Sequence, residues 1–134
     1  MLYKDLNTII EEDLLGNWEM DQVFINQSIE NNLLIQQRLI ALLINNVLQL
    51  ISEKEIEGKW FLLKQFDIIY NPQVKFELNQ KEIGNAIITR FYDTTENSVI
   101  IRKLTLYFDT GLELILKKLI PQSVDKEIIS GQMV

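Results

Sequence analysis

The sequence of 134 residues contains no cysteine and no histidine. Without these residue types there is no thiol nucleophile, no imidazole acid–base pair and no cysteine or histidine ligand set for zinc or haem. The remaining side chains offer carboxylate, amine, phenol and hydroxyl chemistry. We therefore expect a non-enzymatic protein with no catalytic residues, no metal site and no cofactor.

The chain is also poor in basic residues and in loop-forming residues. Its 19 Asp and Glu outnumber 13 Lys and Arg, which gives a formal net charge of -6. This acidic balance disfavours nucleic-acid binding, which needs a basic surface. With two prolines and five glycines there is no linker segment, and we expect one domain over residues 1–121 and a loosely held tail over residues 122–134.

The N-terminal segment lacks the charged, apolar and small-residue regions of a secretory signal. Disulfide bonds are impossible without cysteine. The simplest expectation is therefore a cytoplasmic protein.

Three segments place apolar residues at helical spacing, namely residues 2–15, 28–52 and 112–119. The longest of them, 28–52, is apolar on almost every side, so it needs a covering sheet or a second subunit. Its Gln36, Gln37 and Arg38 interrupt the run too early for a membrane span. The last helix is predicted to begin with a capping box, Thr110-Gly111-Leu112-Glu113, and to end before Pro121.

Four further segments alternate apolar and polar residues as strands do, at residues 60–70, 74–78, 86–92 and 99–108. Residues 17–26 fit a strand or a capped helix, and we favour the strand. Short loops between sequential strands indicate antiparallel pairing. The predicted fold is α+β: an antiparallel meander sheet of four to five strands packed on a long apolar helix, with an N-terminal and a capped C-terminal helix.

Cationic side chains share predicted strand faces with apolar neighbours at Lys64, Arg90 and Arg102. A buried cation needs an internal carboxylate or an anionic ligand as its partner. These three residues, together with Tyr92, are the candidate ligand-binding residues. The alternative is that the strand parity is shifted by one residue, or that the long side chains reach water along the sheet.

One triplet, Gly58-Lys59-Trp60, resembles the Gly-x-Trp motif of the calycin barrels, such as the lipocalins, in which the tryptophan closes one end of the barrel. The resemblance implies a β-barrel of eight or more strands. It covers three residues, and the predicted elements supply only about four strands after it and a helix before it. No functional residue is carried over.

A helix with more apolar surface than one sheet can cover indicates a homodimer or a partner protein. The candidate interface residues are Trp18, Leu34, Leu42 and Trp60. The sequence therefore favours an acidic protein-interaction or accessory module. Two alternatives stay open: a domain that binds an anionic or apolar small molecule between sheet and helix, and an enzyme using Asp67 or Tyr92 as an acid–base group.

Overall fold

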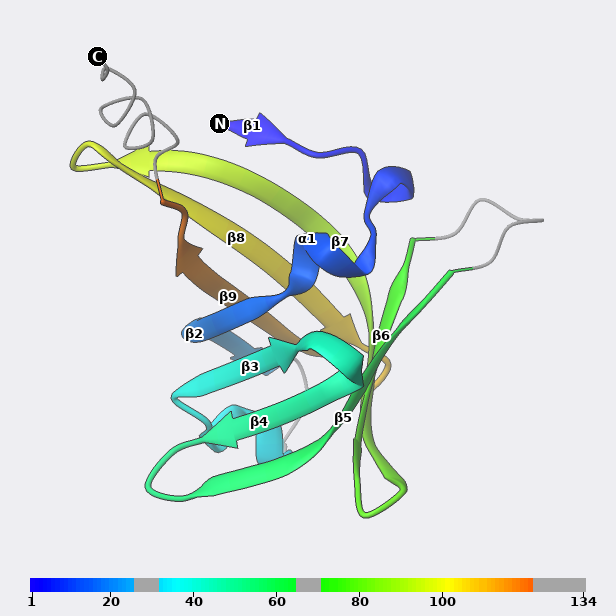
Figure 1. Ribbon diagram of the computed structural model, residues 1–134. Helices are drawn as coiled ribbons and strands as arrows, with labels where there is room; N and C mark the ends of the chain where they lie inside the picture. The colour runs from blue at the N-terminus through cyan, green and yellow to red at the C-terminus, as the bar shows by residue number, and fades with distance from the viewer. Residues whose placement is uncertain (26–31, 65–70, 122–134) are drawn as a thin grey trace.

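The computed structural model describes residues 1–25, 32–64 and 71–121, and it consists mainly of β-strands (Figure 1). The strands are β1 Leu2–Tyr3, β2 Gly16–Ile25, β3 Leu39–Leu43, β4 Val47–Ile51, β5 Glu55–Leu63, β6 Gln73–Leu78, β7 Lys81–Glu96, β8 Val99–Phe108 and β9 Leu112–Leu119. The helical elements are short: η1 Leu6–Thr8, α1 Glu11–Leu14, η2 Leu33–Gln36 and η3 Ile44–Asn46.

The sheet closes on itself. Strands β2 to β9 pair antiparallel with their neighbours in chain order, and β9 returns to pair with β2, which makes an eight-stranded up-and-down barrel. The two-residue strand β1 pairs with β7 beside the barrel. Closure removes the unpaired edges that an open sheet would expose.

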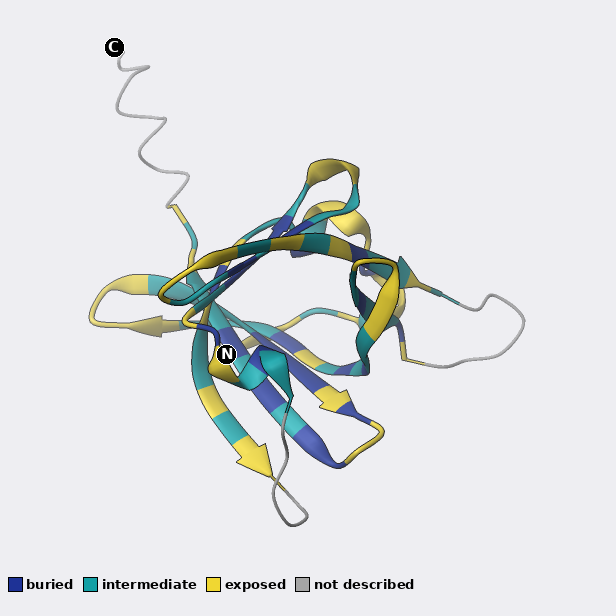
Figure 2. Ribbon diagram, turned by 90° about the horizontal axis from the view of Figure 1, so that it is seen from below, coloured by how far each residue is buried: buried dark blue, intermediate teal, exposed yellow. Residues whose placement is uncertain are grey.

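The core lies inside the barrel. Along most of the barrel strands buried residues alternate with more exposed ones, as the dark blue and lighter segments of Figure 2 show, although β3 and β8 each bury three residues in a row. Side chains from all eight barrel strands fill the interior of the barrel. The largest buried side chains are aromatic, and the buried aromatic residues include Trp18, Trp60, Phe76, Phe91 and Phe108.

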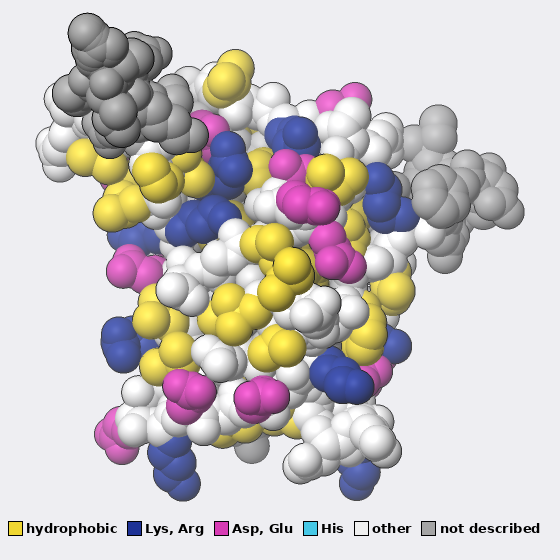
Figure 3. Space-filling view, viewed as in Figure 1, with side chains coloured by type: hydrophobic (Ala, Val, Ile, Leu, Met, Phe, Trp, Pro, Cys, Tyr) yellow, Lys and Arg dark blue, Asp and Glu magenta, His cyan; other side chains and the backbone are white. Residues whose placement is uncertain are grey.

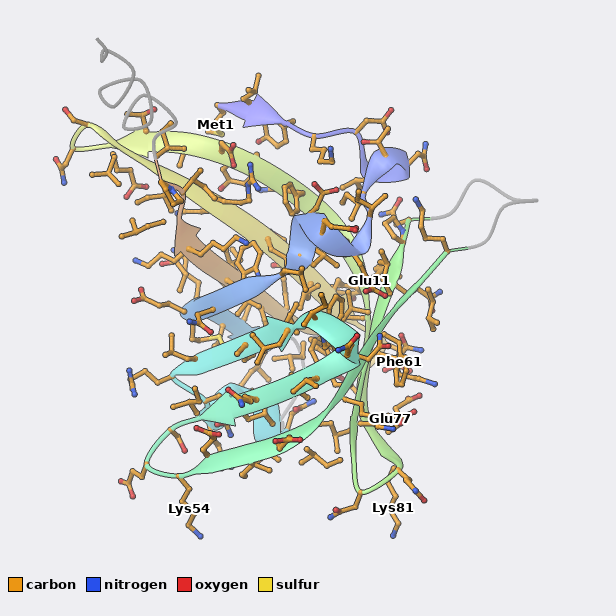
Figure 4. All side chains as sticks on the ribbon, viewed as in Figure 1. Met1, Glu11, Lys54, Phe61, Glu77 and Lys81 are labelled. Atoms are coloured by element: carbon orange, nitrogen blue, oxygen red, sulfur yellow. The ribbon has the colours of Figure 1, made fainter. Side chains whose placement is uncertain are left out.

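Both ends of the barrel are covered. At the end where β2 begins, the N-terminal segment buries Ile9 and Leu14. At the opposite end η2 buries Leu34, whose Cδ1 lies within 3.3 Å of the position that a Cβ on Gly84 would occupy. Figure 4 shows Lys54 and Lys81 at the tips of two hairpins at this second end, far from Met1.

The predicted long helix over residues 28–52 is wrong, and with it the α+β fold class. From residue 32 onward this segment contains η2 and the hairpin of β3 and β4, while residues 26–31 lie outside the described residues. A nearly continuous apolar run does not distinguish helix from buried strand. Asn45 and Asn46 turn the chain with φ of 64° and 62°, a conformation that asparagine tolerates better than most residues.

The predicted terminal helices are wrong as well. The N-terminal segment forms only β1, η1 and the single turn α1. Residues 112–119 form β9, in which Leu112, Leu114 and Leu116 face the core. The expected capping box instead lies in the turn between β8 and β9, where Gly111 has a φ of 92°. The spacing of the leucines here fits the helical period of 3.6 residues and also the strand period of two. The segment is a strand because it pairs with β2 and β8 as the barrel closes.

The predicted antiparallel pairing of sequential strands is confirmed for β5 to β8, but the predicted sheet of four to five strands is wrong. Strands β6 and β8 match the predicted segments 74–78 and 99–108, whereas β7 extends well beyond 86–92 and β5 shares only residues 60–63 with the predicted segment 60–70. Residues 17–26 belong to β2 up to Ile25, which confirms the strand. Residues 65–70 and the predicted tail 122–134 lie outside the described residues.

The barrel has the strand number that the resemblance of Gly58-Lys59-Trp60 implies. Within β5, however, Gly58 has a local packing reason: a Cβ at this position would lie 2.3 Å from the Glu77 carbonyl oxygen of β6. The other Gly-x-Trp triplet, Gly16-Asn17-Trp18, begins β2 and buries Trp18 beneath the N-terminal segment.

Candidate functional site

The first inward-facing cation, Arg102, has an internal partner. It lies opposite Asp93 in the β7–β8 pairing, and its guanidinium donates two hydrogen bonds to that carboxylate, at 2.8 and 3.0 Å. Its charged group also lies 5.2 Å from the centre of the Phe91 ring. The hydrogen bond to Asp93 raises the pKa of Arg102 above its ordinary value. This cation is therefore neutralised within the barrel.

A second cation lies at the same end, Lys118 of β9, which was not among the candidates predicted from the sequence. It lies opposite Arg102 in the β8–β9 pairing, and its ammonium lies 4.6 Å from the centre of the Trp18 ring and donates to the Leu15 carbonyl oxygen. Burial, followed by the charge of Arg102, lowers the pKa of Lys118. Period-two spacing from Leu112 to Lys118 is the signal that could have revealed it.

The other candidate ligand-binding residues do not join Arg102. Lys64, just after β5, donates to the carbonyl oxygens of Asn7 and Ile9 and so fastens the N-terminal segment to the barrel. Arg90 is exposed, because a bulge between Ile88 and Arg90 shifts the strand parity. Tyr92 stacks on Tyr3, with ring centres 5.0 Å apart.

The structure therefore does not bring Lys64, Arg90, Arg102 and Tyr92 together in one pocket. The candidate interface residues Trp18, Leu34, Leu42 and Trp60 are all buried in the core, with at most 1% of their surface exposed. In the folded chain they stabilise the barrel. A contact surface for a partner has to come from outward-facing side chains, which the sequence did not separate from the core. Asp67 lies outside the described residues.

The outer face of β8, β9 and β2 carries a hollow with a volume of about 640 Å³. Its walls are mainly apolar, and β3 and the residues after β9 complete them. Leu119 is 67% exposed there. The apolar lining residues are Leu39, Ile101, Leu119, Ile120 and Pro121. In Figure 3 hydrophobic side chains gather beside the grey atoms at the upper left, over the ends of β8 and β9.

Charged side chains connect the middle of this face. Asp21, at a bulge of β2, lies 3.2 Å from the ammonium of Lys103 on β8 and 3.7 Å from that of Lys117 on β9. Burial is the largest single effect on Lys103 and lowers its pKa, but the hydrogen bond and charge of Asp21, together with the charges of Tyr92 and Glu96, raise the pKa above its ordinary value. These ion pairs tie the three strands together across their outer surface.

Two general kinds of site are not found in the part of the chain that the structure describes. No three acidic side chains there are grouped so that they could hold a metal ion. None of the described helices has the length and apolar character needed to cross a membrane.

Comparison with protein-family models, with curated proteins and with solved structures finds no match to this chain. The functional argument therefore depends on the geometry of the barrel and its outer surface.

Proposed function

We propose that this protein is a non-enzymatic interaction module that binds an extended, apolar segment of a partner protein in the hollow on the outer face of β8, β9 and β2. The observation that carries the proposal is the hollow of about 640 Å³ walled by exposed Leu119 and Pro121 and by half-buried leucine and isoleucine side chains. Apolar surface of this kind, bordered by charged residues, is typical of protein-interaction sites.

A peptide segment fits this hollow better than an enclosed small molecule does. Small-molecule sites usually surround about 70–90% of their ligand, whereas this hollow lies on the outside of a closed barrel and opens to solvent. Its lining residues run from Lys117 through Leu119 to Pro121, just beyond the end of β9, a length that suits a few residues of an extended chain lying along this strand.

The charge of the protein indicates what should flank the apolar segment. With a net charge of -6 the chain attracts basic sequences from a distance, which accelerates encounter at low ionic strength. The hollow itself is lined by Glu19, which is exposed, and by Lys117 and Lys118, so the preference for basic neighbours comes from the overall charge and not from the lining. The proposed ligand is thus an apolar stretch with basic neighbours.

The test is a selection from a peptide library displayed on phage, followed by calorimetric titration of the selected peptides. Leu119→Asp places a charge in the hollow and should weaken binding at least tenfold. Leu63→Asp is the matched control, because Leu63 is an exposed leucine on the distant strand β5. It should leave the affinity unchanged.

Selected peptides rich in apolar and basic residues, with binding lost only in Leu119→Asp, would support the proposal. Peptides that bind both variants like the wild type would contradict it. Light scattering tests whether a second copy of the chain fills the hollow instead. A dimer that Leu119→Asp converts to a monomer would assign the hollow to that second copy and overturn the proposal.

A further inference from the structure

At the opposite end of the same outer face, two aromatic side chains stand on either side of a carboxylate. Glu113 of β9 is paired with Phe24 of β2 on one side and with Tyr107 of β8 on the other. All three point outward, since the neighbouring residues Leu112 and Leu114 are buried. Directly paired residues bring their Cβ atoms to within about 4.5–5.5 Å, so the carboxylate stands between two rings.

These side chains are available to a ligand. Phe24 is 50% exposed and Tyr107 is 39% exposed. Together with Val23, Ile25 and Gly111 they line a separate hollow of about 530 Å³. Both rings therefore lie on the outer surface, where a ligand can contact them.

Among the residues that the structure describes, the Glu113 carboxylate has no cationic partner. Glu113 makes no ion pair with any Lys or Arg in residues 1–25, 32–64 and 71–121. The next charged cluster on this face, Asp21 with Lys103 and Lys117, is already ion-paired, and Lys103 also lies 3.8 Å from the Glu96 carboxylate. A partly buried carboxylate flanked by two aromatic side chains attracts a cation by charge, and the rings can add cation–π interaction.

We propose that Phe24, Glu113 and Tyr107 form a binding site for an arginine side chain of a partner peptide. A guanidinium is planar, stacks on aromatic rings and pairs with a carboxylate through two hydrogen bonds, so it uses both features of the site. An ammonium group would use only the charge and one ring face. The site adds a basic contact to the proposed function, but it lies apart from the apolar hollow and is testable without it.

The experiment is a titration of ¹⁵N-labelled protein, followed by NMR, with the peptide acetyl-Gly-Arg-Gly-amide. The amides of residues 24, 107 and 113 should shift together with one dissociation constant. Glu113→Gln should weaken this binding at least tenfold, and Phe24→Leu or Tyr107→Leu about two- to tenfold each, as expected for loss of one cation–π contact. Acetyl-Gly-Lys-Gly-amide should bind more weakly.

Two controls distinguish a specific site from a general charge effect and from the apolar hollow. Glu55→Gln removes the same charge from an exposed position on β5 and should leave the titration unchanged. Leu119→Asp, which disables the apolar hollow, should also leave it unchanged, so failure of the proposed function and failure of this inference are distinguishable. Unchanged unfolding temperatures would show that each variant is folded.

Equal weakening by Glu113→Gln and Glu55→Gln would mean that only the overall charge attracts the peptide, and would overturn the site. Equal affinity for the arginine and lysine peptides would overturn the assignment to a guanidinium. Shifts scattered over the surface, without the amides of residues 24, 107 and 113, would also contradict it.

Discussion

The guanidinium of Arg102 on β8 and the carboxylate of Asp93 on β7 form a two-hydrogen-bond pair inside one end of the barrel. The pair is three-quarters buried, with side-chain exposures of 26% and 25%. Because the carboxylate neutralises it, the inward arginine needs no anionic ligand. The pair also joins the two strands at the end that the N-terminal segment covers.

Asp93→Asn should lower the free energy of unfolding by about 1.5–3 kcal/mol, the usual value of a hydrogen bond to a charged group. The loss follows because Arg102 keeps its charge but loses its carboxylate partner. Urea unfolding measures it, with Asp109→Asn in the exposed β8–β9 turn as control. In a double-mutant cycle with Arg102→Met, the two effects should be less than additive. Additive effects would show that the pair does not act as a unit.

Lys118 gives a prediction for alkaline pH, because its pKa is lowered in the folded protein. Between this lowered pKa and the ordinary value of 10.5, the unfolded chain binds more protons at this residue than the folded chain does. The stability of the wild type relative to Lys118→Met should therefore rise as the pH increases through that interval. Urea unfolding of both proteins from neutral to alkaline pH measures the difference. A difference that falls with pH contradicts the buried position of the ammonium.

Gly58→Ala should destabilise the barrel by about 1–3 kcal/mol, the usual cost of overpacking. The added Cβ would lie 2.3 Å from the Glu77 carbonyl oxygen and 2.5 Å from a methyl group of Leu78, so β5 and β6 must separate locally. Lys59→Ala, at the next and exposed position, is the control. Thermal unfolding that is the same for both variants would show that the close approach of the strands is unimportant.

Asn45 tests the hairpin that replaces the predicted long helix. Asn45→Val should cost about 1–2 kcal/mol, because a β-branched residue is strained at positive φ. Asn45→Gly should be neutral or stabilising, since glycine adopts this conformation without steric cost. If Asn45→Val were as stable as the wild type in urea, the turn between β3 and β4 would not be needed for folding.

Trp18 and Trp60 each donate an indole hydrogen bond to a backbone carbonyl, at Leu14 and Leu43 respectively. Trp18→Phe should cost about 2 kcal/mol or more, since it leaves that carbonyl unsatisfied and removes part of a filled core. It should also release the ammonium of Lys118 from its position over the ring. Tyr3→Phe, at an exposed ring, is the control and should change the unfolding free energy little.

The predictable part of the fold was the part in which alternation was unambiguous. Strands β6 and β8 follow clean alternation, as in Val74, Phe76 and Leu78, and no helical pattern competes with it. Residues 39–51 and 112–119 are apolar at so many positions that the sequence fits both the strand period of two residues and the helical period of 3.6 residues. The choice depends on long-range pairing of β3 with β2 and of β9 with β2 and β8, which local spacing does not contain.

The site residues were also predicted correctly only where the strand is regular. Arg102 was identified as an inward cation because β8 is regular from Ile100 to Leu104. Arg90 was misplaced because a bulge shifts the parity of β7, and bulges have no clear signal in the sequence. Phe24, Glu113 and Tyr107 were not grouped at all, since residues 112–119 were predicted as a helix and β2 becomes a neighbour of β9 only when the barrel closes.

By itself the sequence determined the absence of thiol and imidazole chemistry, the acidic charge and the central meander, because these follow from residue types and local alternation. Tertiary structure decided the barrel, the inward pairing of Arg102 with Asp93 and the outer face of β8, β9 and β2. The barrel and this outer face require β2 and β9, which lie far apart in the chain, to hydrogen-bond side by side, and the Arg102–Asp93 pair requires the register of the β7–β8 hairpin beyond its bulge. An apolar run of leucine and isoleucine adopts whichever backbone such pairing satisfies.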